Sequence, residues 1–127
     1  MVIDTSIFIE FLRKKDKTDT LLYSISEGSP LTISVITLYE LLMGATNTIK
    51  KHDIKILTDD LVILDFDKEI ASYAAKIYHQ LRRSNKMIEF RDIFIAATCL
   101  AYDMPILTLN KKHFERISNL KFVDIKE

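Results

Sequence analysis

The sequence contains few of the residues that break or cross-link regular structure. Its 127 residues include only 2 glycines, 2 prolines and 1 cysteine, and they lack tryptophan. A single cysteine excludes an internal disulfide framework and agrees with a reducing compartment. Hydrophobic residues make up 48% of the chain, which argues against intrinsic disorder. We therefore expect one globular domain over residues 1–127, located in the cytoplasm.

Long apolar runs and an excess of either charge are also missing. No apolar stretch approaches the ~20 residues that a membrane span requires, and the N-terminus lacks the pattern of a signal peptide, so we expect no membrane association. The 18 basic and 18 acidic side chains balance, so attraction of nucleic acid through global charge is not expected. A glycine-rich phosphate loop is absent, which argues against a nucleotide-binding enzyme.

Two local basic clusters remain despite the balanced charge. They consist of Arg82, Arg83 and Lys86, and of Lys111, Lys112, His113 and Arg116. Each cluster taken alone is best explained as a solvated helix face.

Short apolar segments alternate with longer helical patterns along the chain. Strands are expected at 1–4, 30–34, 61–66, 105–109 and 120–125. Helical spacing is found at 5–14, 19–28, 35–44, 47–60, 67–86, 91–103 and 111–117. The second of these helices is expected to end at Gly28. This alternation predicts a parallel sheet covered by helices on both faces, with a ligand site beyond the carboxyl ends of the strands.

Two polar residues directly follow predicted strands. Asp4 comes after "MVI" and Asn110 after "ILTL", which places both at the carboxyl edge of the predicted sheet. Each residue also fits a second role, as the N-cap of the helix that follows it. An N-cap and a ligand role are compatible for Asp4, because the same turn can present its carboxylate.

Glu40 and Asp92 are acids within apolar helical segments. Glu40 fits the middle of a helix that starts soon after Ser34, and this is favoured over a capping box from Thr37 to Glu40. Asp92 fits either the buried side of its helix or a first-turn acid favoured by the helix dipole; the adjacent Arg91 is expected on the surface. Carboxylates gathered at a sheet edge suit Mg²⁺ or Mn²⁺, which can support phosphodiester cleavage with two metals ~3.5–4 Å apart.

The segments "VIDTSIFIEFL", "SVITLYELLMGA", "RDIFIAATCLAYDMPILTLNKKHF" and "ISNLKFV" occur in this order and extend over nearly the whole chain. In this order they resemble the PIN-domain ribonucleases, and specifically the VapC-type toxins of bacterial and archaeal toxin–antitoxin pairs. The resemblance implies a three-layer α/β/α sandwich with a central parallel sheet of about five strands. It also implies a Mg²⁺-dependent, or Mn²⁺-dependent, endoribonuclease that inhibits growth until its antitoxin neutralises it.

The resemblance carries over the site residue by residue. It implies that Asp4, Glu40 and Asp92 bind the metal, and it puts the family's fourth position at Asn110. Asn110 can bind through its amide oxygen but brings no charge, which agrees with a weakly held or absent second metal. Hydroxyls around the acids are expected from Thr5, Ser6 and Thr108. Flanking phosphates are expected to contact Arg82, Lys86, Lys111 and Arg116.

The resemblance further implies partners. These are a VapB-type antitoxin, a second copy of the chain in a homodimer, an RNA substrate, and operator DNA contacted only through the antitoxin. The groove that receives the antitoxin is expected to include Phe8, Phe11, Leu12 and Met43.

Three other functions compete with the toxin. A housekeeping PIN nuclease in RNA maturation shares the chemistry. A catalytically inactive PIN-like binding protein has Asn110 as its only support. A haloacid-dehalogenase-type phosphatase is disfavoured, because Ser6 stands where that family has a second Asp.

Overall fold

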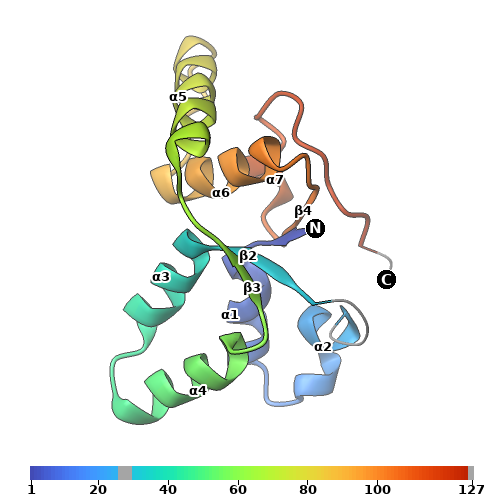
Figure 1. Ribbon diagram of the computed structural model, residues 1–127. Coiled ribbons are helices and arrows are strands. Elements are labelled where there is room, and N and C mark those ends of the chain that lie inside the picture. Colours follow the sequence, from blue (N-terminus) through green and yellow to red (C-terminus); the bar gives the residue numbers. More distant parts are fainter. Residues whose placement is uncertain (26–29, 126–127) are drawn as a thin grey trace.

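A four-stranded parallel sheet forms the centre of the computed structural model, which describes residues 1–25 and 30–125. The strands are β1 (Val2–Ile3), β2 (Thr32–Ser34), β3 (Val62–Leu64) and β4 (Ile106–Leu107). Their order across the sheet is β3-β2-β1-β4, with Val2 of β1 opposite Thr32 on one side and Ile106 on the other (Figure 1). The two central strands, β1 and β2, are fully buried, as the sequence predicted for a sheet covered on both faces.

Helices cover both faces of the sheet. They are α1 (Thr5–Arg13), α2 (Leu21–Ile25), α3 (Val35–Gly44), α4 (Thr48–Thr58), α5 (Lys68–Arg83), α6 (Phe90–Ala101) and α7 (Lys111–Phe114), with a short 3-10 helix η1 (Lys17–Asp19). Figure 1 shows α1–α4 on one side of the sheet and α5–α7 on the other, so the predicted three-layer fold is confirmed. The predicted helix end at Gly28 lies outside the described residues. Across 1–25 and 30–125, no helix is long and apolar enough to cross a membrane.

The alternation of side chains along the strands divides the interior into two cores. Val2 and Ile106 belong to the core under α5, α6 and α7. Ile3, Ile33 and Leu107 belong to the core under α1–α4. Successive strand residues point to opposite faces, so each two-residue strand contributes one side chain to each core.

The last predicted strand, at 120–125, is reduced to a single bridge. Phe122 pairs with Ile106 in parallel, through Ile106 N–H to Lys121 O at 2.9 Å and Val123 N–H to Ile106 O at 2.9 Å. The strand that it joins, β4, contains only two residues, and only one of them is bridged on this side. The sheet therefore has four strands where about five were expected.

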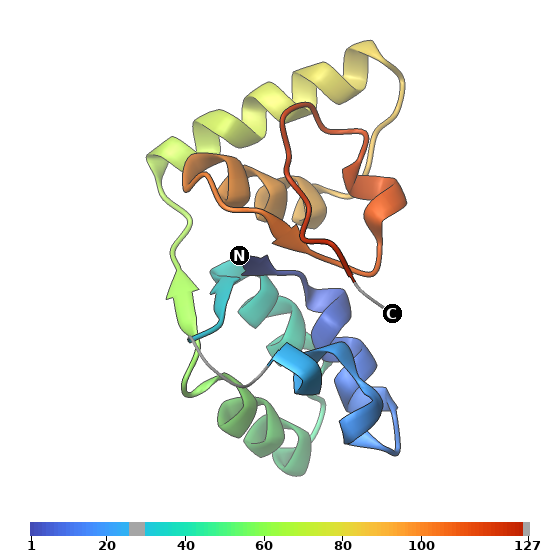
Figure 2. The ribbon, with the colours of Figure 1, turned by 90° about the vertical axis from the view of Figure 1, so that its right-hand side faces the viewer.

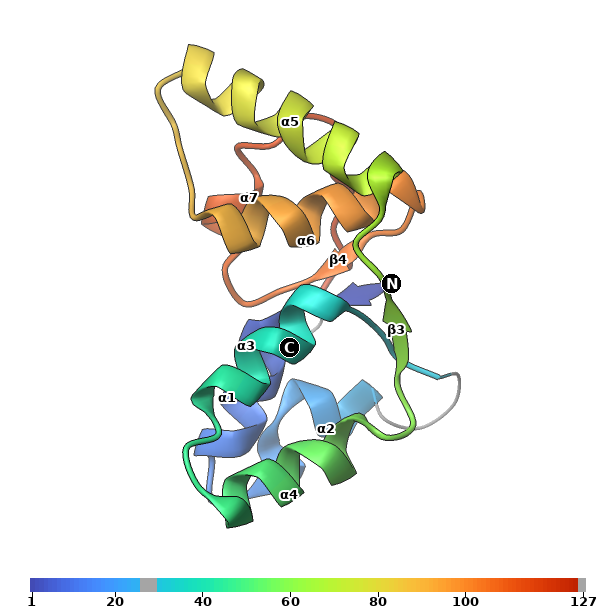
Figure 3. The ribbon, with the colours of Figure 1, turned by 60° about the vertical axis from the view of Figure 1, so that its left-hand side comes forward.

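The order in which successive strands are added to the sheet reverses between β1 and β4. From β1 it passes to β2 and then β3 through helices on one face; it then crosses to the other face for α5 and α6 and returns to β4 beside β1 (Figures 2 and 3). After β1 the chain enters α1 in one core, and after β4 it enters α7 in the other. Such a switch point is where open α/β sheets bind ligands.

We expect two phenylalanines near the start of their helices to differ in their effect on stability. Phe8 is fully buried and Phe90 is 63% exposed. Phe8→Leu leaves unfilled core space and should lower the free energy of unfolding by about 1–2 kcal/mol. Phe90→Leu should change it by less than about 0.5 kcal/mol. Urea unfolding measures both, and equal losses would contradict the described packing.

Candidate active site

A cleft of about 400 Å³ opens at the carboxyl ends of β1 and β4. Its lining includes all four residues that the sequence analysis selected, Asp4, Glu40, Asp92 and Asn110. Asp4 directly follows β1 and Asn110 lies just beyond β4, while Glu40 comes from α3 on one face and Asp92 from α6 on the other. All three layers of the fold therefore contribute an acid to one cleft.

Asp4 is held by side-chain hydroxyls from both strand ends. It is 2% exposed, and its Oδ2 accepts hydrogen bonds from Ser6 Oγ and Thr108 Oγ1, each at 2.7 Å. Asp4 stands at the N-cap position of α1, but its side chain makes no capping hydrogen bond. The prediction that the Asp4 side chain caps α1 is therefore wrong. The prediction that Ser6 and Thr108 supply hydroxyls beside an acid is confirmed.

The same two hydroxyls also fix the loop after β4. Ser6 Oγ accepts from the Leu109 N–H at 3.0 Å, and Thr108 Oγ1 accepts from the Asn110 N–H at 2.9 Å. Asn110 is exposed and makes no side-chain cap on α7, so that alternative is wrong too. Its amide lines the cleft instead.

Glu40 lies in the second turn of α3. The helix begins at Val35, where Ser34 Oγ accepts from the Ile36 N–H at 3.0 Å, so the capping box starting at Thr37 is wrong. Glu40 Oε1 accepts from Thr5 Oγ1 at 2.9 Å, and Oε2 lies 3.8 Å from an Arg91 nitrogen. Burial raises the pKa of Glu40, although Thr5 and Arg91 both act to lower it.

Asp92 is the least compensated of the three acids. It lies in the first turn of α6, is half-buried, and accepts no side-chain hydrogen bond from the described part of the chain. Burial raises its pKa to about 6, and the charges of Asp4, Glu40 and Glu89 add to that effect more than His113 offsets it. The favourable helix dipole at this position is therefore not sufficient to stabilise the carboxylate.

Arg91 is a site residue that sequence reasoning missed. It was expected on the surface, and its guanidinium pairs with Glu89 Oε2 at 3.1 Å and with Glu40 at 3.8 Å. The available signal was its position next to Asp92 in the first turn of a helix. The pairing itself depends on the packing of α3 against α6, and this packing cannot be read from the residue spacing of a single sequence.

The oxygen donors of the cleft are of the kind that a hard divalent cation prefers, but they lie too far apart to bind one ion together. Three carboxylates and one amide supply the oxygen ligands that Mg²⁺ and Mn²⁺ prefer. Within residues 1–25 and 30–125, no three His, Cys, Asp or Glu side chains are grouped closely enough to hold one ion. Burial, and after it the charges of Asp4 and Glu40, raise the pKa of Asp92, and a cation would favour its ionised form if the side chains moved together.

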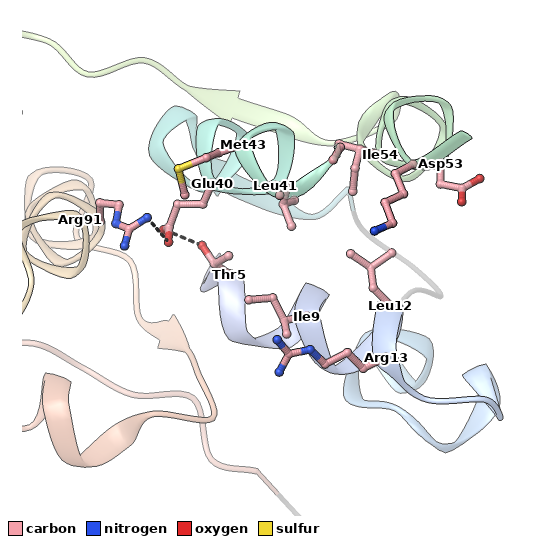
Figure 4. Close-up of a pocket in the computed structure, with 13 residues that line it drawn as sticks. Thr5, Ile9, Leu12, Arg13, Glu40, Leu41, Met43, Asp53, Ile54 and Arg91 are labelled. Carbon is pink, nitrogen blue, oxygen red and sulfur yellow. Dashed lines mark hydrogen bonds and ion pairs between the residues drawn. The ribbon is translucent and has the colours of Figure 1, made fainter. Parts of the chain in front are cut away.

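A larger groove of about 680 Å³ continues from the cleft between α1, α3 and α4 (Figure 4). Its apolar lining includes Ile9, Leu12, Leu41, Met43 and Ile54. Thr5, Ile9, Arg13 and Glu40 line both the groove and the cleft.

Only two of the four expected groove residues line this groove. Leu12 and Met43 do. The prediction for Phe8 is wrong, because the helical spacing points its side chain into the core, where it is fully buried. Phe11 is half-buried, packs against the same core and does not line the groove.

The fold and the cleft define the class of protein: an α/β/α domain with an acidic site at the carboxyl edge of its parallel sheet. Residues 1–120 match the family model described as "PIN domain". The chain is 31% identical over 126 residues to ribonuclease VapC1 of Methanocaldococcus jannaschii, a match covering 98% of this chain and 87% of that protein. It is 33% identical over 132 residues to ribonuclease VapC of Rickettsia bellii, covering 98% and 96%.

Solved structures agree with this similarity. The fold matches VapBC-1 from nontypeable Haemophilus influenzae with a TM-score of 0.83 at 27% identity, over 97% of this chain and 96% of that one. It matches DNA-bound VapBC from Salmonella typhimurium with a TM-score of 0.80 at 25% identity, over 97% and 96%. The chain therefore belongs to the PIN domain family, and its relatives place it among the VapC ribonucleases.

We expect Asp92→Asn to stabilise the metal-free protein at neutral pH. The folded-state pKa of about 6 lies above the ordinary value of 3.8, so the contribution of Asp92 to stability is full below about pH 4 and is lost as pH rises through about 6. Asn carries no charge and avoids this loss. The variant should gain about 1 kcal/mol in the free energy of unfolding at about pH 7.5, a value reduced for solvent screening.

Urea unfolding in EDTA across this pH range measures the gain. Asp65→Asn is the matched control, because Asp65 is exposed, and it should stay within about 0.5 kcal/mol of the parent. A loss of stability in Asp92→Asn at neutral pH would contradict the electrostatic account of the cleft.

Proposed function

We propose that the chain is a divalent-metal-dependent endoribonuclease that acts as the toxin of a toxin–antitoxin pair, with Mg²⁺ or Mn²⁺ as its cofactor. The observation that carries the proposal is the meeting of Asp4, Glu40 and Asp92 in one cleft at the switch point of the sheet. Three carboxylates in one half-buried cleft are costly unless a cation joins them.

The hydrogen bonds support different roles for the three acids. Among the described residues, both hydrogen bonds to the Asp4 carboxylate fall on Oδ2, which leaves Oδ1 available to a cation. Asp92 has no hydrogen-bond donor there and is the acid that gains most from a cation. Both oxygens of Glu40 are engaged, by Thr5 and Arg91. We assign Asp4 and Asp92 as direct ligands and Glu40 as a ligand through water or after Arg91 moves away.

The residues of the chain then position the reaction. When bound, the cation supplies an activated water and offsets charge on the phosphate. Ser6 and Thr108 hold the Asp4 carboxylate in place, and Thr5 holds Glu40. Arg91 brings a positive charge to the rim of the cleft, where it can approach an RNA phosphate. Asn110 offers an amide that can accept from water or donate to a phosphate oxygen.

The same cleft residues also bear on the two competing functions, an inactive binding protein and a housekeeping nuclease. An inactive binding protein would have no need for three desolvated acids, and Asn110 alone does not remove the ligand set. A housekeeping nuclease would use the same cleft. A toxin differs from such a nuclease in having a protein partner that inhibits it.

The catalytic proposal predicts that loss of one acid or of the metal abolishes RNA cleavage. Asp4→Asn and Asp92→Asn in Mg²⁺, and the parent protein in EDTA, should each lose about a thousandfold in rate, because several kcal/mol of transition-state stabilisation disappear. Asp65→Asn, purified in the same way, controls for contaminating nucleases and should cleave like the parent. Undiminished cleavage by either acid variant, or in EDTA, would contradict the metal mechanism.

The groove beside the cleft supports the partner proposal. Leu12 is 39% exposed and Met43 is 52% exposed, and both line a groove with an apolar floor and charged rim residues such as Arg13 and Asp53. An amphipathic segment of a VapB-type antitoxin fits such a groove. Operator DNA is then contacted through the antitoxin, in keeping with the zero net charge of this chain.

We expect Met43→Glu to weaken antitoxin binding at least about tenfold, because a charge replaces an apolar contact in the groove. The partner used is the proposed VapB-type antitoxin, and binding is measured by calorimetry. Tyr102→Glu is the control, since Tyr102 is exposed but lies outside the groove.

Expression of the chain with and without that partner tests the toxin assignment. Growth arrest with discrete new RNA ends, relieved by the partner, is the expected outcome. Arrest that the partner does not relieve would favour the housekeeping nuclease.

A further inference from the structure

A second cleft, of about 500 Å³, adjoins the acids on the side opposite the apolar groove. It is lined by Met87, Ile88, Glu89, Asp92, Asn110, His113 and Arg116. Asp92 and Asn110 line both this α7-side cleft and the acidic cleft, so the two form one continuous depression.

We propose that the α7-side cleft binds the nucleotide next to the scissile bond of single-stranded RNA, with its phosphate on Arg116 and His113 and its base or ribose against Met87. This deepens the proposed nuclease function and rests on it.

Arg116 has the free donors that a phosphate site needs. Among the described residues its guanidinium makes one long hydrogen bond, from Nη1 to Met87 O at 3.4 Å, and joins no ion pair. A guanidinium has five N–H donors, so most of them remain available to an anion. His113, which lies in α7 three residues before Arg116, lines the same cleft and is close enough to Asp92 for its charge to lower the pKa of that acid.

The backbone around Arg116 is fixed in advance. Gln80 of α5 donates from Nε2 to Arg116 O at 2.8 Å and accepts at Oε1 from the Ser118 N–H at 3.1 Å. These two bonds anchor the segment after α7 to the long helix. A guanidinium carried by an ordered backbone loses less entropy when it binds a phosphate.

The other basic residues expected to contact RNA are placed elsewhere. The Lys111 ammonium lies over the Phe122 ring, 5.3 Å from its centroid. Arg82 Nη1 donates to the Tyr78 hydroxyl at 3.1 Å, and Lys86 is not among the lining residues of the α7-side cleft. Of the four candidates from the sequence, Arg116 is the one that lines a cleft shared with Asp92.

The size and lining of the cleft favour one unstacked nucleotide. Its volume lies in the range of small-ligand sites, and the 38% exposed Met87 side chain offers an apolar surface to a base. Bases within a duplex are not available to such a surface, whereas single-stranded bases are. The polar α7-side cleft thus suits RNA, and the apolar groove on the other side of the acids suits a protein segment.

The test measures cleavage of a fluorescein-labelled single-stranded RNA in Mg²⁺ and its binding by anisotropy in EDTA. We expect Arg116→Gln and His113→Gln each to raise KM and the dissociation constant about tenfold with kcat within about twofold. The slope of log K against log salt should become shallower by about 0.7 for each lost phosphate contact. Arg116→Lys, which keeps the charge, should retain the salt slope.

Arg83→Gln is the matched control, because Arg83 is an exposed guanidinium at the end of α5 that does not line the cleft. Met87→Ala supplies a separate readout, since it should change the preferred nucleotide beside the mapped RNA ends. The proposal is overturned if Arg116→Gln and His113→Gln keep the KM, affinity and salt slope of the parent. If the parent cleaves no RNA, the nuclease function fails, and the anisotropy comparison still decides whether this cleft binds RNA.

Discussion

The buried carboxylate of Asp4 is the interaction on which the site depends. It lies between the ends of β1 and β4, and the hydroxyls of Ser6 and Thr108 donate to the same oxygen. These hydroxyls also accept from backbone N–H groups of the loop after β4. One carboxylate thereby joins two strands that send the chain to opposite faces of the sheet, and the opening between them becomes the cleft.

The ionised forms of two acids in the cleft are electrostatically unfavourable. Burial raises the pKa of both Glu40 and Asp92, the charge of Asp4 adds to this at both acids, and the charge of Glu40 adds to it at Asp92. Perturbed pKa values and a local loss of stability are typical of functional sites. Arg91 offsets part of this charge from the rim. The three carboxylates are therefore compensated differently: hydroxyls donate to Asp4, Arg91 lies beside Glu40, and in the proposed function a cation would neutralise Asp92.

The surroundings of the acids differ between the two sides. On the α1–α3–α4 side the lining is mostly apolar, with exposed Leu12 and Met43. On the α7 side it carries Arg116 and His113. The difference follows from the switch in topology, since each side is built by helices of a different layer. In the functions proposed above, a protein segment and an RNA strand would therefore approach the same acids from different sides, and inhibition and catalysis would use separate surfaces.

The sequence by itself determined the order of strands and helices, because hydrophobic periods of two and of 3.6 residues depend only on neighbours along the chain. It also placed Asp4 and Asn110 at strand ends, and the motif order identified the family. Tertiary structure decided which side chains meet. It turned Phe8 into the core, reduced the last strand to a bridge at Phe122, and brought Arg91 to Glu40. It also separated Arg116 from the other basic residues. These outcomes depend on how α3, α6 and α7 pack across the sheet, and contacts between distant segments leave no periodic signal in a single sequence.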